Sequence, residues 1–122
     1  MEYSIRLSEN HSYVELKIVG DFTATEMLRL VAESHSFGKS NDVHNYLVDS
    51  LSARNIDSAM GNYQFAYKDM PEVEEVDPLA RVAVLVSPDD HSHDFIETVA
   101  FNTGSTLKIF RSFNEAINFL DQ

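Results

Sequence analysis

The stretch Arg81-Val82-Ala83-Val84-Leu85-Val86 decides the fold of this chain. It is a continuous run of mostly apolar residues, which is typical of a strand covered on both faces in a parallel sheet. Ser87 and Pro88 follow it directly, and proline suits the first position of a helix. We therefore expect a buried strand that leads into a helix at Pro88. The buried face of that helix would consist of Phe95, Ile96, Val99 and Ala100.

The residues before this run show strand and helix patterns in turn. Two alternating segments, Tyr3–Leu7 and Val14–Ile18, flank a polar turn and predict an antiparallel pair with one face partly open to water. Thr23–Glu26 has the pattern of a capping box, so a helix is expected to begin there and to end at Gly38. Tyr46–Val48 then predicts a short strand.

Apolar residues at helical spacing predict a second helix, which Pro71 would end. They are Ala59, Tyr63, Ala66, Tyr67 and Met70. The acidic loop from Pro71 to Pro78 is either a solvated connector or a docking patch for a basic partner. Its carboxylates are Glu72, Glu74, Glu75 and Asp77. Leu107–Phe110 predicts the last strand, and Ser112–Glu115 is a second capping box that begins the last helix.

These elements follow the order β-β-α-β-α-β-α-β-α. Strands that alternate with helices imply right-handed crossovers and a mainly parallel sheet. The sequence therefore predicts one α/β domain over residues 1–122, with a five-stranded, mostly parallel sheet, an antiparallel N-terminal edge strand and four helices.

The composition narrows the range of partners. Nine Lys+Arg against 20 Asp+Glu give a formal net charge of −11, which disfavours nucleic acid and anionic membrane surfaces as partners. The absence of cysteine excludes disulfides, thiolate nucleophiles and cysteine metal sites. No signal peptide and no apolar run near the roughly 20 residues of a membrane span are visible. The expected location is the cytoplasm, and no cofactor is expected.

The most polar cluster is Asp89–Asp94, which is expected to form a solvated helix start. His91 and His93 would lie about 200° apart on that helix and could not share an ion, whereas Asp90 and Asp94 could share a face, so a weak metal site is the alternative. His11, His35 and His44 each lie near a turn and are expected at the surface. No hydrolase, metalloprotease or phosphate-binding motif is present. We therefore expect a protein that is not an enzyme. A hydrolase of unknown substrate ranks third, after the two binding functions described below.

Three stretches resemble the STAS domains of anti-sigma-factor antagonists. Val14–Asp21 (VELKIVGD) resembles the second strand of that family, which ends in a glycine–acidic pair before the first helix. Asn45–Ser58 (NYLVDSLSARNIDS) resembles its third strand and the Asp-Ser that opens the second helix. Ala80–Pro88 (ARVAVLVSP) resembles a strand followed by Ser-Pro and a helix. The end, Lys108–Leu120, resembles a subgroup of small bacterial STAS-like proteins.

The resemblance implies a non-enzymatic regulatory module that binds a protein partner. In regulatory STAS proteins the serine after the aspartate is phosphorylated by a partner kinase, and the matching pair here is Asp57 and Ser58. Phosphate there would add about two negative charges to a docking surface. This chain departs from the family pattern, because Ala59 and Met60 stand where a second hydroxyl and then glycine are usual, and Gly61 comes one place late. The alternative is that Asp57 and Ser58 only cap a helix.

The second predicted helix would supply the binding surface. Its candidates are Met60, Tyr63, Phe65 and Tyr67. They would form a protein-binding face or, alternatively, a groove for an apolar small molecule or lipid near Phe65. A homodimer through this helix or an exposed edge strand is a further expectation.

Overall fold

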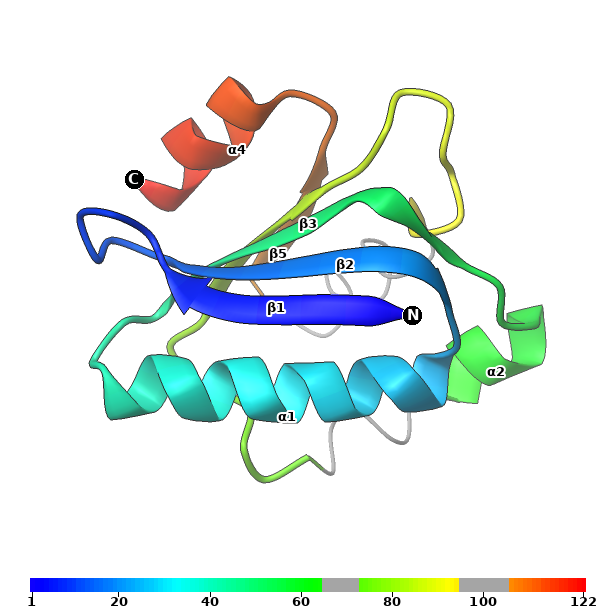
Figure 1. Cartoon of the computed structure of the whole chain (residues 1–122), viewed down its shortest axis with the longest axis horizontal. Coiled ribbons are helices and arrows are strands. Elements are labelled where there is room, and N and C mark those ends of the chain that lie inside the picture. The colour runs from blue at the N-terminus through cyan, green and yellow to red at the C-terminus, as the bar shows by residue number, and fades with distance from the viewer. Residues whose placement is uncertain (65–72, 95–105) are drawn as a thin grey trace.

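The computed structural model describes residues 1–64, 73–94 and 106–122. The strands are β1 (Glu2–Leu7), β2 (Val14–Phe22), β3 (Asn45–Asn55), β4 (Arg81–Leu85) and β5 (Leu107–Phe110). The helices are α1 (Ala24–Ser40), α2 (Ala59–Gln64) and α4 (Phe113–Leu120). Figure 1 shows α1 along one side of the sheet and α4 on the other.

The five strands form one sheet in the order β1-β2-β3-β4-β5. β1 pairs with β2 antiparallel, and the other three pairs are parallel. The predicted mixed sheet with an antiparallel edge strand is therefore confirmed. Because β2, β3, β4 and β5 run parallel, their carboxyl ends meet at one edge of the sheet.

Successive side chains of a strand point to opposite faces of the sheet, so the strands contribute to a core on each face. On one face Leu16, Ile18 and Phe22 of β2 pack with Leu30 of α1. On the other face Leu47, Ala83 and Leu85 pack with Ala116 and Leu120 of α4. Burial of each leucine, isoleucine or phenylalanine side chain in these clusters contributes roughly 2 kcal/mol to stability. α4 thus covers the face that α1 leaves open.

Local sequence signals place the starts of α1 and α4 correctly. The Thr23 side chain accepts from the Glu26 N–H, and the Glu26 carboxylate accepts from the Thr23 N–H at 3.0 Å, which completes the predicted capping box. Ser112 accepts from the Glu115 N–H at the start of α4. Both helices therefore begin where a hydroxyl side chain can satisfy a free backbone donor.

Three local expectations are wrong. α1 does not end at Gly38 but runs to Ser40, and Gly38 is buried inside it. β3 is not confined to Tyr46–Val48 but extends to Asn55, because its polar second half pairs with β2 as far as Phe22. No helix begins at Pro88, because Pro88 and Asp89 lie in a turn.

The number of described helices is three, where the sequence predicts four. The predicted face of the remaining helix, from Phe95 to Ala100, lies outside the described residues. The same holds for Ala66, Tyr67 and Met70 of the second predicted helix, of which α2 is the described part.

Candidate functional site

The candidate site lies where β3 and β4 end, at the edge formed by the carboxyl ends of the parallel strands. In open α/β sheets this edge is the usual place for ligands and partners, because the loops there converge while the strands hold them rigid. Asp57 and Ser58 follow β3 directly and precede α2. The loop after β4 brings Asp90, Ser92 and His93 to the same edge, where the Ser92 Oγ accepts from the Asn55 N–H at 3.2 Å.

Asp57 joins two elements through its carboxylate. Oδ2 accepts from the N–H of Ala24, the first residue of α1, at 2.7 Å. Oδ1 accepts from the Ser58 N–H at 2.8 Å. A carboxylate at a helix start satisfies a free donor and interacts favourably with the helix dipole. Asp57 therefore supports the start of α1, thirty-three residues earlier in the chain, and helps to fix the position of Ser58.

Ser58 caps α2 and is exposed. Its Oγ accepts from the Gly61 N–H at 3.0 Å, and its carbonyl accepts from the Asn62 N–H at 3.0 Å. A Cβ atom at position 61 would overlap the Asp57 carboxylate. The absence of a side chain at Gly61 therefore leaves room for the anchored Asp57 carboxylate.

Replacing Asp57 with alanine is expected to lower the free energy of unfolding by about 1–2 kcal/mol, because the Ala24 and Ser58 donors lose a charged acceptor. Urea unfolding would measure the change. The matched control is Asp89→Ala, at an exposed turn residue, for which we expect less than about 0.5 kcal/mol. Equal effects of the two substitutions would show that Asp57 does not hold α1.

Apolar side chains beside Ser58 are solvent-exposed. Met60 is 73% exposed and Ile56 is 56% exposed. Exposed apolar residues next to a modifiable hydroxyl can form part of a docking surface. Of the other predicted surface residues, Tyr63 lies in α2, but its side chain is outside the described part of the chain. Phe65 and Tyr67 also lie outside it, and so does the alternative groove around Phe65.

The Asp89–Asp94 segment is not the solvated helix start that the sequence predicts. His93 is only 5% exposed, and its ring stacks on Phe22 with centroids 5.5 Å apart. Its Nε2 lies 3.5 Å from the Asp90 Oδ2, and burial lowers the pKa of His93. His91, by contrast, is exposed and pairs with Asp94 at 2.8 Å. Among the described residues no group of three or more His, Cys, Asp or Glu side chains could hold a metal ion.

A second polar cluster lies at the opposite edge, where the parallel strands begin. The Asp77 Oδ2 accepts from the Tyr46 hydroxyl at 2.8 Å and lies 2.6 Å from the His44 Nδ1. The His35 Nδ1 accepts from the Asp77 N–H at 2.9 Å, and the His35 ring stacks on Tyr46 with centroids 4.3 Å apart. The cluster ties the end of the acidic loop to α1 and β3.

Two expectations fail at this cluster. His35 is only 6% exposed and Asp77 only 3%, although the sequence suggests a surface histidine and a solvated loop. A signal for His35 was present, because Leu30, Ser34 and Gly38 recur at helical spacing and mark the buried face beside it. Glu74 and Glu75 of the same loop are exposed as expected, and Glu72 lies outside the described residues.

The charges of the second cluster follow from its contacts. Burial lowers the pKa of His35 to about 4. The hydrogen bond to Asp77 raises the pKa of His44. Burial alone would raise the pKa of Asp77, but hydrogen bonds from His44, the Leu79 N–H and Tyr46 outweigh it and hold that pKa below its ordinary value. At neutral pH Asp77 is therefore a buried carboxylate and His35 is neutral.

Comparison with solved structures identifies this arrangement of strands and helices. The anti-sigma-factor antagonist SpoIIAA in its unphosphorylated form matches over 98% of both chains, with a TM-score of 0.53 and 14% identity. The chain has a SpoIIAA-like, STAS-like fold. The phosphorylated form of SpoIIAA, a Bacillus cell fate determinant, matches 96% of this chain and 97% of its own, with a TM-score of 0.52 and 14% identity.

A third structure extends the likeness. An uncharacterized DUF3478-family protein from Shewanella loihica PV-4, described as having a SpoIIAA-like fold, matches 98% of this chain and 92% of its own length, with a TM-score of 0.56 and 19% identity. No protein-family model and no curated protein sequence matches the chain. Among the described residues no helix is long and apolar enough to cross a membrane.

Proposed function

We propose that this chain is a non-enzymatic regulatory module that binds a protein partner through the surface around Ser58, and that phosphorylation of Ser58 weakens this binding. The observation that carries the proposal is the exposed Ser58 hydroxyl, held beside the anchored Asp57 carboxylate. The SpoIIAA-like fold supports it, since SpoIIAA is an anti-sigma-factor antagonist known in unphosphorylated and phosphorylated forms. We expect the module to act in the cytoplasm.

The physical effect of phosphate on this surface would be large. Ser58 lies between Ile56 and Met60, both more than half exposed. A phosphoserine carries about two negative charges near neutral pH. Burying the phosphate against a partner's apolar surface would remove it from water, which is costly for a charged group. The Asp57 carboxylate, held in place beside Ser58, would repel the phosphate, and this repulsion grows when water is excluded. A partner that fits the neutral serine would therefore dissociate from the modified form.

The test compares wild type with Ser58→Asp as a charge mimic. Both are immobilised, native lysate of the source organism is passed over them, and captured proteins are identified by mass spectrometry. The matched control is Ser52→Asp, which adds the same charge at an exposed serine on β3. We expect at least one protein that wild type and the control retain and Ser58→Asp loses.

A second measurement addresses the modification itself. The chain is incubated with the same lysate and ATP, and phosphorylated residues are mapped by mass spectrometry. Phosphate on Ser58, and its absence from a Ser58→Ala variant, is the expected result. The proposal is wrong if Ser58 stays unmodified and the three immobilised proteins capture the same set.

A further inference from the structure

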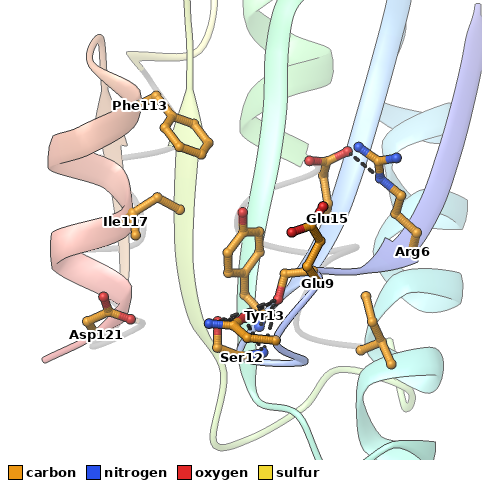
Figure 2. A pocket seen from close by; sticks show the side chains of 11 residues that line it. Arg6, Glu9, Ser12, Tyr13, Glu15, Phe113, Ile117 and Asp121 are labelled. Carbon is orange, nitrogen blue, oxygen red and sulfur yellow. Dashed lines mark hydrogen bonds and ion pairs between the residues drawn. The ribbon is translucent and has the colours of Figure 1, made fainter.

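A groove on the molecule lies away from Ser58, between the β1–β2 turn and α4. Its volume is about 530 Å³, within the range of clefts that bind small molecules or peptide segments. Figure 2 shows Tyr13 between Glu9, Glu15 and Arg6 of the hairpin on one side and Phe113 and Ile117 of α4 with its C-cap Asp121 on the other. Residues near the start of β2 and along α4 form it, so it is separate from the edge that carries Ser58.

The charges that line the groove are mostly negative. Glu9, Glu15 and Asp121 line it together with one cation, Arg6. The Arg6 Nε pairs with the Glu15 Oε1 at 3.0 Å. Of the three carboxylates that line the groove, Glu9 and Asp121 are exposed and form no ion pair with the described residues. Burial raises the pKa of Tyr13, and the negative charges of Glu15, Asp121 and Glu9 add to this effect although Arg6 opposes it. All three carboxylates therefore lie close enough to the Tyr13 hydroxyl to influence its ionisation.

The position of Asp121 is a second, independent feature. Asp121 is the C-cap of α4, and the last turn of α4 contains no basic residue. The carboxyl end of a helix carries a partial negative charge, so an aspartate there is destabilising. A cation bound in the groove would compensate both the helix end and the carboxylate.

Apolar surface accompanies these charges. Phe113 is 50% exposed at the start of α4, and Ile117 lies one helical turn further along the same side. Carboxylates beside an exposed aromatic ring match an arginine or lysine side chain, whose stem is apolar and whose head is cationic. The groove is open to solvent, which fits a segment of chain better than an enclosed ligand.

We propose that this groove docks a basic segment of a partner protein, with a cationic side chain between Glu9 and Asp121 and an apolar neighbour against Phe113 and Ile117. The proposal does not depend on phosphorylation of Ser58. It assigns this groove to arginine- or lysine-bearing sequence and not to an apolar ligand.

The test uses a short synthetic peptide of alternating leucine and arginine, titrated into the isotope-labelled chain and followed by two-dimensional NMR. We expect the shifts to concentrate at Tyr13, Ile117 and Asp121. The double variant Glu9→Gln/Asp121→Asn is expected to bind about three- to tenfold more weakly, the effect of losing two solvent-exposed ion pairs. A peptide with citrulline in place of arginine, which keeps the shape and loses the charge, is expected to bind equally weakly.

The matched control is Glu74→Gln/Glu75→Gln, which makes the same change in net charge at exposed positions outside the groove. Its affinity for the peptide is expected to stay within twofold of wild type, by the small contribution of remote, screened charges. Equal weakening by both double variants would reduce the binding to non-specific attraction and overturn the proposal. So would the absence of binding to wild type, or tighter binding of spermidine at the same residues, which would assign the groove to a small polyamine.

Discussion

Replacing Gly38 with alanine is expected to lower the free energy of unfolding by about 2–3 kcal/mol, although alanine is the better helix former by about 1 kcal/mol. Gly38 lies inside α1, and a Cβ atom there would overlap the Tyr46 hydroxyl and lie 2.7 Å from both the Tyr46 Cζ and the Val43 carbonyl oxygen. The backbone carbonyl cannot rotate away, and Tyr46 is held by its hydrogen bond to Asp77. The added methyl group must therefore push α1 away from β3.

Chemical denaturation of wild type and Gly38→Ala would measure this loss. The control is Lys39→Ala, the next residue of the same helix, which is exposed and should change stability by less than about 0.5 kcal/mol. A second comparison uses Tyr46→Phe, which removes the hydroxyl that a Cβ would meet. In that background Gly38→Ala should cost less than in wild type. An alanine variant as stable as wild type would show that α1 does not need glycine for this contact.

The same position shows how far the sequence predicts the fold. Three local patterns are enough to predict the sheet and its mainly parallel pairing. They are the alternation in the strands, the two hydroxyl caps and the apolar run at Arg81–Leu85. These are local signals, which depend only on neighbouring residues. Gly38 was expected to end a helix, but its role is set by Tyr46, eight residues later in the chain and across the interface between helix and sheet. The sequence pattern of one helix cannot reveal a contact with a residue on a neighbouring strand.

The candidate site was predictable to a similar degree. The Asp57–Ser58 pair was recognisable because it follows a strand and precedes a helix, and Ser58 caps that helix. The second role of Asp57, at the start of α1, was not predictable, since only the parallel arrangement of β2 and β3 brings Ala24 to it. The burial of His93 beside Phe22 and of Asp77 beside Tyr46 likewise depends on contacts between distant segments.

Lowering the pH from 6.5 to 4 is expected to destabilise the protein by about 3 kcal/mol through His35 alone. Burial lowers the pKa of His35 from 6.5 to about 4, Lys39 adds to this effect, and the Asp77 carboxylate opposes it. The unfolded chain therefore takes up a proton as the pH falls below 6.5, whereas the folded chain begins to do so only as the pH approaches 4. The stability present above pH 6.5 is lost as the pH falls between these two values. Protonation of Nδ1 would also break its bond from the Asp77 N–H.

The two titratable groups bonded to each other in this cluster, His44 and Asp77, affect stability mainly outside this pH range. His44 has a raised pKa, so its contribution is complete below 6.5 and is lost only as the pH rises through its folded value. Asp77 has a lowered pKa, so its contribution is complete above 3.8 and is lost only at more acidic pH. Burial also lowers the pKa of His93, so this residue acts in the same direction as His35. It would account for part of any pH dependence of stability that remains when His35 is replaced.

Urea unfolding at a series of pH values from 4 to 7 would measure how the free energy of unfolding changes with pH. Wild type is compared with His35→Gln, which removes the titrating ring and keeps a hydrogen-bond acceptor. The variant is expected to lose most of the pH dependence in this range, whatever its absolute stability. The control is His11→Asn, at an exposed turn residue with φ 56°, a conformation that asparagine tolerates. Because His11 lies outside the buried cluster, its replacement should leave the slope of wild type unchanged. If His35→Gln and wild type lose stability in parallel between pH 6.5 and 4, the acid sensitivity resides elsewhere and His35 is accessible to protons in the folded chain.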